Sequence, residues 1–259
     1  MLLAIDVGNT NTVFALFRDD VQISSWRAAT QASRTGDEYF AWLESMVSAK
    51  ASINEINAVI VSSVVPKVRF NLLHLCERYF KCVPLEVGSK NCLLPIEIKV
   101  DQKSQVGADR IVNTVSAYDR YGGNLIVVDF GTATTFDVVG EDGSYLGGVI
   151  APGVDLSIKA LHQAAAALPR IDVAQPSQIV GKNTLECMQS GFFWGYISLI
   201  EGITKRIQTE QNKEMTLIGT GGYSLEFDQS PGLFAHVEMD LTIHGLRLIY
   251  DYNRKNTYG

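Results

Sequence analysis

Residues 6–12 combine a carboxylate, a glycine and four small polar side chains. The order is Asp6-Val7-Gly8-Asn9-Thr10-Asn11-Thr12, directly after an apolar run that is typical of a buried strand. Gly8 permits a tight turn, and the side chains after it can donate hydrogen bonds to phosphate oxygens. Asp6 would repel a polyphosphate unless a cation stood between them, so the turn predicts Mg²⁺, bound directly or through water. The alternative is a turn aspartate that accepts hydrogen bonds from nearby backbone amides.

A second segment of the chain repeats this pattern. Residues 3–27 and 125–149 each contain an apolar run, an aspartate, a glycine two positions later, small polar residues and a second apolar run. In the second copy the aspartate is Asp129 and the glycine is Gly131. Self-similarity of this kind predicts two related halves. Each copy puts a carboxylate and a glycine turn at a strand end, where backbone amides can approach phosphates, so we predict a nucleotide cleft between the halves.

A third candidate is Gly107-Ala108-Asp109-Arg110, at the predicted start of a helix. The positive end of the helix dipole favours an ionised Asp109. The guanidinium of Arg110 suits a carboxylate or phosphate ligand. Spacing alone leaves two interpretations open, because aspartate at a helix N-terminus is also an ordinary capping residue.

The elements that must position these residues alternate between strands and helices. Besides the two repeated segments, each predicted to be a hairpin of two strands, strands and helices are predicted at residues 35–47 (helix), 58–65 (strand), 68–80 (helix), 83–87 (strand), 107–121 (helix), 155–167 (helix), 183–207 (helix) and 216–218 (strand). This alternation predicts an α/β fold that binds ligands at the carboxyl ends of its strands. We place the domain boundary near Tyr118, which gives domains of residues 1–117 and 118–259.

The composition excludes several functional classes. The 259 residues are 46% hydrophobic and 19% charged, as expected of a globular protein with a sizeable core. A net charge of −6 argues against nucleic acid as the main ligand. The N-terminus has no basic region of an export signal, and residues 192–200 are far shorter than the roughly 20 residues that span a membrane. The four cysteines form no C-x-x-C pair, which favours buried thiols over a metal site.

Two glycines in the predicted helix of residues 183–207 leave a further choice open. Gly191 and Gly195 are four residues apart and therefore share one helix face. Such a face permits close approach of another backbone, either in the core or at a subunit contact.

Six motifs, in order, resemble the type III pantothenate kinase family. The motifs are Asp6–Asn11, Ser62–Pro66, Gly107–Arg110, Asp129–Thr135, Gly181–Thr184 and Met188–Gly191. The resemblance extends from residue 1 to about residue 250. It implies the fold of acetate and sugar kinases, Hsc70 and actin, which is an α/β fold of two duplicated actin-like (ribonuclease H-like) domains with ATP in the cleft.

The same resemblance implies an activity. Members phosphorylate the primary hydroxyl of pantothenate with ATP, the first step of coenzyme A biosynthesis. It implies a cytoplasmic homodimer that uses Mg²⁺ and a monovalent cation, K⁺ or NH₄⁺, with the interface on the second domain and the pocket near it. Two alternatives remain: a kinase of another small hydroxy acid, and a catalytically silent nucleotide-binding regulator. A regulator would have no need of an intact Asp109.

Residue roles follow from the matched motifs, again as implications of the resemblance. Asp109 is the general base, and Asp129 is the ligand of the monovalent cation. The residues implied to contact ATP are Asp6 (also near Mg²⁺), Val7, Gly8, Asn9, Thr10, Asn11, Thr12, Val13 and Thr132. Those implied to line the pantothenate pocket are Val100, Gly107, Ala108, Asp109, Arg110 and Thr184, with Arg110 on the carboxylate.

The chain departs from the family pattern at two places. Many members have a tyrosine where this chain has Val100, so one pocket hydroxyl is missing. The turn at Gly221-Gly222 continues with Tyr223-Ser224, where small apolar residues are usual. The first departure bears on the affinity for substrate and the second on the packing of adenine.

Overall fold

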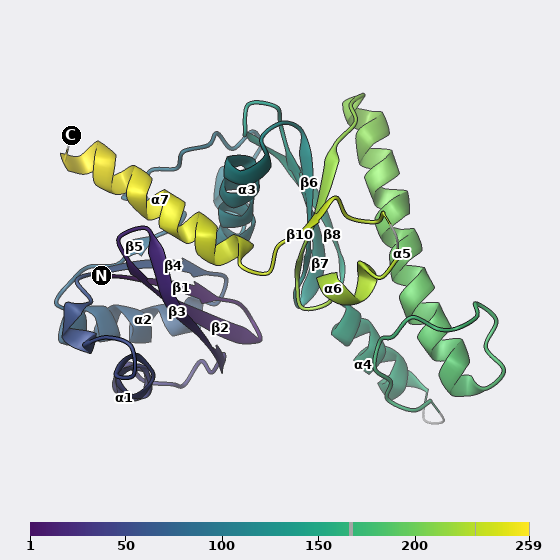
Figure 1. Ribbon diagram of the computed structural model, residues 1–259, viewed down its shortest axis with the longest axis horizontal. Coiled ribbons are helices and arrows are strands. Elements are labelled where there is room, and N and C mark those ends of the chain that lie inside the picture. Colours follow the sequence, from purple (N-terminus) through teal and green to yellow (C-terminus); the bar gives the residue numbers. More distant parts are fainter. Residues whose placement is uncertain (166–167, 231, 259) are drawn as a thin grey trace. The chain divides into compact units, whose positions relative to one another are not determined.

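The computed structural model describes residues 1–165, 168–230 and 232–258 (Figure 1). These residues form two compact units. Unit 1 contains Met1–Glu97, Asp101–Ser116 and the described residues from Leu241 onward, and unit 2 contains Ile98–Val100 and the described part of Ala117–Asp240. The sequence placed one boundary near Tyr118, between domains of residues 1–117 and 118–259. In the structure the last helix belongs to unit 1, and Ile98–Val100 belong to unit 2.

A five-stranded mixed sheet forms the centre of unit 1. Its strands, in chain order, are β1 (Leu2–Val7), β2 (Asn11–Arg18), β3 (Val21–Ala29), β4 (Ala58–Ser63) and β5 (Leu85–Glu86). The order in the sheet is β3-β2-β1-β4-β5, with β1 antiparallel to β2 and parallel to β4. The predicted two-stranded hairpin at the N-terminus is therefore wrong. Asp19, with a φ of 51°, turns the chain into a third strand.

Helices complete unit 1. They are α1 (Gly36–Val47), α2 (Pro66–Leu75), the π-helical η2 (Cys76–Phe80), the first part of α3 (Ala108–Tyr121) and α7 (Leu241–Tyr258), with short 3₁₀ turns η1 (Ile53–Glu55) and η3 (Lys103–Gln105). The sequence Thr35-Gly36-Asp37-Glu38 has the pattern of a capping box, and the structure confirms it, since Thr35 Oγ1 accepts from Glu38 N and Glu38 Oε2 accepts from Thr35 N. α1 and α2 bury Leu43 and Leu72 in one core with Ile5 of β1.

Unit 2 repeats the sheet of unit 1 strand for strand. Its strands are β6 (Leu125–Phe130), β7 (Ala133–Val139), β8 (Tyr145–Pro152), β9 (Thr216–Gly221) and β10 (His236–Val237). The order is β10-β9-β6-β7-β8, with β6 antiparallel to β7 and parallel to β9. The predicted duplication is therefore confirmed. The sequence predicted residues 216–218 as the last strand. They belong to β9, and β10 follows β9 in the chain, so this prediction is wrong.

The described part of unit 2 contains the helices α4 (Val154–Ala164), α5 (Thr184–Gln211) and α6 (Ser224–Phe227), together with the last residues of α3. The sequence left Asn183 and Thr184 as alternative caps of this helix, and Asn183 caps α5 by accepting a hydrogen bond from Glu186 N at 3.0 Å. The predicted helix 155–167 corresponds to α4, and its last two residues, 166–167, lie outside the described residues. None of the helices in the described ranges combines the length and the apolar character that crossing a lipid bilayer requires.

The C-terminal helix supports the helix that carries Asp109. α7 packs on β1 and β4, and its Thr242 hydroxyl donates to Asn113 Oδ1 in α3 at 2.8 Å. A side-chain carbon on Gly245 would overlap the carbonyl oxygen of Val112. The two helix backbones therefore touch, and α7 fixes the first half of α3 in unit 1.

Candidate functional site

The end of β1 brings two of the predicted motifs together within unit 1. Val64 N donates to Val7 O at 3.1 Å, so the chain leaving β4 runs beside the end of β1. A side-chain carbon on Gly107 would lie 3.7 Å from Val64 Cγ1. The start of α3 is thus close to the turn that follows Asp6. Asp109 stands in the first turn of that helix.

The turn between β1 and β2 is closed by short hydrogen bonds. Gly8 N donates to Asn11 O at 3.0 Å. Thr30, at the end of β3, donates through its hydroxyl to Gly8 O at 2.7 Å and through its amide to Thr10 O at 2.9 Å. Its hydroxyl also lies 2.9 Å from that of the buried Thr12. Asn9, Thr10 and Asn11 are exposed at the tip of this turn, and its main chain is held from behind by Thr30.

Thr30 is a positioning residue that the sequence did not reveal. Its bonds join the end of β3 to a turn some twenty residues earlier, and β3 itself was not predicted. The only local signal is a hydroxyl side chain after a strand, which is common.

We expect Thr30→Val to weaken ATP binding. The substitution keeps the shape but leaves the Gly8 carbonyl and the Thr12 hydroxyl without a partner, at a cost of about 1–3 kcal/mol. Because the turn loosens, the KM for ATP should rise several-fold while the KM for the second substrate stays the same. Steady-state kinetics with Ser33→Ala, an exposed hydroxyl in the same loop, as control would measure this. An unchanged KM for ATP contradicts the bracing role.

Asp109 has the environment of a proton acceptor. Its Oδ1 accepts a hydrogen bond from Arg110 N at 2.8 Å, and the residue is half-buried. Burial raises the pKa of Asp109 above its ordinary value of 3.8, while the Arg110 amide and guanidinium oppose the shift. A higher pKa makes the carboxylate a stronger base, and this is an arrangement typical of functional sites.

Because Gly107 has no side chain, the Asp109 carboxylate can occupy the space beside it. A side-chain carbon at Gly107 would lie 2.5 Å from Asp109 Oδ1, so the two cannot coexist in this arrangement. The glycine therefore sets the direction of the carboxylate.

We expect Gly107→Ala to lower kcat by one to two orders of magnitude, because a displacement of about 1 Å at a reacting group can cost 10²-fold. The fold should survive, since the displaced atom ends a side chain that can rotate. Ser104→Ala, in the exposed turn before it, is the matched control. Rates and thermal melts of the two variants would be compared. Full activity in Gly107→Ala would show that the direction of the carboxylate is not critical.

The second aspartate turn lies in unit 2, between β6 and β7. Gly131 N donates to Ala133 O at 3.0 Å, which closes the turn as in unit 1. Thr132 is exposed at its tip. A side-chain carbon at Gly153, just before α4, would overlap the carbonyl oxygen of Thr132. The start of α4 thus packs directly on this turn.

Asp129 depends on the glycine turn at the end of β9. Gly221 has a φ of 86°, a conformation that L side chains rarely adopt, and a side-chain carbon there would lie 2.5 Å from Asp129 Oδ1. Gly222 N donates to Phe130 O at 2.9 Å. A glycine turn at a strand end is also a place where a nucleotide can bind, and in the structure Gly221 leaves the space that the Asp129 carboxylate occupies.

The donor atoms at both aspartates suit hard cations. Asp6 offers a half-buried carboxylate at a strand end, and within the described ranges no group of three or more histidine, cysteine, aspartate or glutamate side chains could hold a metal alone. One carboxylate is compatible with Mg²⁺, which typically uses one or two carboxylates together with substrate phosphates. Asp129 likewise offers a half-buried carboxylate, at the end of β6.

Two predicted pocket residues lie in unit 2, apart from the Gly107–Arg110 motif of unit 1. Val100 follows a short bridge from Ile98 to Tyr145, and its Cγ1 would contact a side chain placed at Gly147 in β8. Thr184 is the exposed first residue of α5. The structure describes each unit by itself, so a common pocket for these residues stays a prediction.

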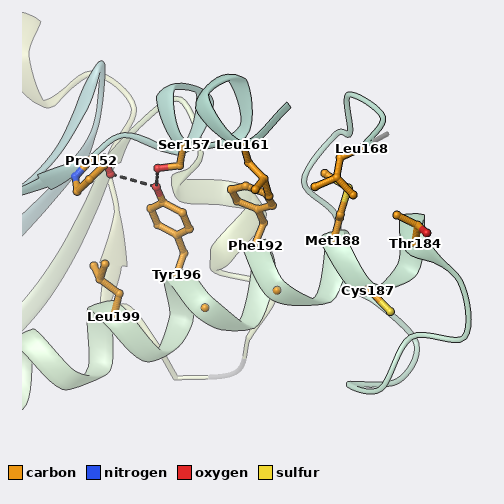
Figure 2. A pocket seen from close by; sticks show the side chains of 12 residues that line it. Pro152, Ser157, Leu161, Leu168, Thr184, Cys187, Met188, Phe192, Tyr196 and Leu199 are labelled. Carbon is orange, nitrogen blue, oxygen red and sulfur yellow. Dashed lines mark hydrogen bonds between the residues drawn. The ribbon is translucent and has the colours of Figure 1, made fainter. Parts of the chain in front are cut away.

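Thr184 stands at one end of an apolar groove of about 680 Å³ along α4 and α5. Figure 2 shows Met188, Phe192 and Tyr196 pointing from α5 toward α4. The Tyr196 hydroxyl donates to Pro152 O at 3.1 Å and lies 2.8 Å from Ser157 Oγ. The remaining residues that line the groove are Leu161, Leu168, Cys187, Gly191, Gly195 and Leu199.

The two glycines of α5 lie on the exposed side of the helix. No other atom comes within 4 Å of a side-chain carbon placed on Gly191 or Gly195. Of the two alternatives left open by the sequence, packing in the core of this unit is therefore wrong.

The hydroxyl of Tyr223 already has a partner. It donates to Asp155 Oδ1 in the first turn of α4 at 2.6 Å. Burial and this hydrogen bond raise the pKa of Tyr223. Tyr223, at which the chain departs from the family pattern, thus links the end of β9 to α4.

Comparison with known sequences decides the family. A family model described as Type III pantothenate kinase matches residues 2–206. The chain belongs to the type III pantothenate kinase family. Curated type III pantothenate kinases include one from Roseobacter denitrificans, 53% identical over 255 residues, and one from Cereibacter sphaeroides, 55% identical over 254 residues; each match covers 98% of this chain and 99% of the relative. The resemblance stated from the motifs is therefore confirmed.

Solved structures confirm the fold. A protein from Campylobacter jejuni described as a Baf family transcriptional activator superposes with a TM-score of 0.63 at 20% identity, covering 98% of this chain and 99% of that one. A protein from Sinorhizobium meliloti described as a 2-dehydro-3-deoxygalactonokinase gives 0.62 at 10% identity, covering 100% and 97%. At these identities the likeness concerns the fold alone. It agrees with the predicted α/β fold of two duplicated actin-like domains.

Proposed function

We propose that this chain phosphorylates pantothenate to 4′-phosphopantothenate with ATP, the first step of coenzyme A biosynthesis. The observation that carries the proposal is the position of Asp109, a half-buried carboxyl with a raised pKa, beside the end of β1 in unit 1. Membership of the family and identities of 53–55% to curated pantothenate kinases support the choice of substrate. These substrates imply a cytoplasmic reaction.

Phosphoryl transfer requires mainly alignment and neutralisation of charge. We propose that residues 6–13 and Thr132 bind ATP, and that Mg²⁺, held by Asp6 directly or through water, would neutralise charge on the phosphates. Asp109 accepts the proton of the pantothenate hydroxyl as its oxygen bonds to the γ-phosphorus and the bond to ADP breaks. A positioned base of this kind typically contributes 10²–10⁴-fold.

We propose that Gly107, Ala108, Asp109 and Arg110 hold pantothenate, with the Arg110 guanidinium paired to the substrate carboxylate. Thr184 and Val100 are proposed as further pantothenate contacts. Because Val100 lacks the hydroxyl of the usual tyrosine, the affinity for pantothenate rests more on Arg110 and Thr184.

A coupled assay of ADP release would test this function. Turnover with ATP and pantothenate supports the proposal. Turnover only with another small hydroxy acid supports a related kinase, and nucleotide binding without turnover on any alcohol supports a silent regulator. Either of the last two results overturns the proposal.

We propose further that the chain acts as a homodimer through the α5 groove. The groove is apolar, Gly191 and Gly195 leave the helix backbone open, and Leu156 and Leu185 nearby are 52% and 46% exposed. A second copy can bring an identical face against it around a two-fold axis, which lets one patch cover itself.

We expect Gly195→Leu to convert the dimer to a monomer. The new side chain projects into the open space of the groove and blocks close approach of the partner. Light scattering after size-exclusion chromatography would measure the mass, with Lys205→Leu, an exposed position later in α5 and outside the groove, as control. If both variants remain dimers, the subunit contact lies elsewhere.

A further inference from the structure

Two cysteines in unit 1, Cys76 and Cys82, are linked by a main-chain hydrogen bond at the end of α2. The helix widens into the π-helical turn η2 and stops at Lys81, whose φ is 54°. This left-handed residue turns the chain back, so Cys82 N donates to Cys76 O at 3.3 Å. The two residues are thereby held side by side. Single-turn π segments of this kind occur frequently at functional sites.

The two thiols differ in burial. Cys76 is fully buried in the core of unit 1, and Cys82 is partly exposed at the edge of the same cluster. Both are present as free thiols. Cys82 is thus the member of the pair that a small oxidant in solution can reach, and Cys76 is shielded behind it.

The thiols also interact. Interaction with the Cys82 sulfur, together with burial, raises the pKa of the Cys76 thiol. The same interaction lowers the pKa of Cys82, against the opposing effect of its partial burial. The exposed member therefore has more thiolate, the nucleophilic form of cysteine.

We propose that Cys76 and Cys82 form a reversible disulfide when the protein meets hydrogen peroxide. The Cys82 thiolate attacks the peroxide oxygen, the O–O bond breaks, and Cys82 becomes a sulfenic acid as one water leaves. The Cys76 sulfur then attacks the Cys82 sulfur, its proton and the hydroxyl leave as a second water, and the S–S bond forms. Two thiols are oxidised and one peroxide is reduced to two waters.

The other cysteines lack this arrangement and serve as controls. Cys92 is buried beside the Asn253 amide, and burial raises the pKa of Cys92 to about 11. Cys187 is exposed on α5, and its thiol lies 3.5 Å from Gly181 O rather than near a second sulfur. Neither has a resolving cysteine beside it, so neither is expected to form a disulfide within the chain.

Tryptic digestion suits this test, because Arg78 and Lys81 lie between the two cysteines. The chain would be treated with one equivalent of hydrogen peroxide, its remaining thiols alkylated, and its peptides analysed by mass spectrometry. The expected product is peptide 70–78 joined to peptide 82–90, lost on reduction with dithiothreitol. Thiol titration of the unfolded Cys187→Ser chain, which retains three of the four cysteines, should fall to one thiol after oxidation.

Two variants separate the proposal from non-specific oxidation. Cys82→Ser should leave Cys76 fully alkylated after peroxide treatment, while Cys92→Ser should still give the linked peptide. A thermal melt confirms that each variant is folded. Recovery of both peptides unlinked, or of Cys82 only as a sulfinic acid, overturns the proposal. Neither result bears on the kinase activity, which is measured separately.

Discussion

Replacing Asp109 by asparagine is expected to reduce turnover by about 10²–10⁴-fold, the usual contribution of a positioned general base. Asparagine keeps the size of the side chain but cannot accept the hydroxyl proton. ATP binding should change little, because the phosphate turn of residues 8–12 is closed by its own hydrogen bonds and by Thr30. Steady-state rates and calorimetric titration with ATP would measure the two effects separately. Asp101→Asn, an exposed aspartate in the preceding segment, is the matched control.

The same variant should be at least as stable as the wild type. Burial raises the pKa of Asp109 in the folded state, so the protonated form is favoured there. An acid of this kind stabilises the fold below its unfolded pKa, and the contribution is lost as the pH rises through the folded pKa. At neutral pH the ionised Asp109 therefore lowers the stability of the folded state, and replacement by asparagine removes this effect. A marked fall in melting temperature would mean that Asp109 is a structural residue.

Replacing K⁺ by Na⁺ is expected to lower turnover at least tenfold, or about 1.4 kcal/mol of transition-state stabilisation. Asp129 offers a half-buried carboxylate at the end of β6, next to the glycine turn that keeps it in place. A bound monovalent cation would balance part of the charge that develops on the phosphoryl group. Rates in K⁺, NH₄⁺ and Na⁺ at equal ionic strength would measure the effect.

Asp129→Ala should remove this dependence and leave low activity in all three salts. Asp172→Asn, an exposed aspartate of the same unit, should respond to the salts like the wild type. Equal wild-type rates in potassium and sodium would exclude the cation, and a normal cation response in Asp129→Ala would move it to another site.

Local chemistry made much of this protein predictable. Short stretches of sequence determine the Thr35 capping box, the Asn183 cap and the aspartate–glycine turns. Each of these features involves residues close in the chain. The duplication was visible because both copies keep the same order of apolar, acidic and small residues. The family motifs are equally local, which is why they pointed to the right family.

Features that depend on distant contacts were not predictable. Helix α7 returns to unit 1 because Gly245 lets it touch α3, a contact between residues more than a hundred positions apart. The roles of Thr30 toward Gly8, and of Gly221 toward Asp129, likewise exist only in three dimensions. A hydroxyl or a glycine is too common for its position alone to reveal such a role.

A single-turnover experiment tests the central claim most directly. Enzyme in excess over labelled ATP would be mixed with pantothenate and quenched on the millisecond scale, for the wild type and for Asp109→Asn. The account predicts rapid formation of labelled 4′-phosphopantothenate by the wild type and a chemical step slowed by at least 10²-fold in the variant. Equal rates for the two proteins would contradict it.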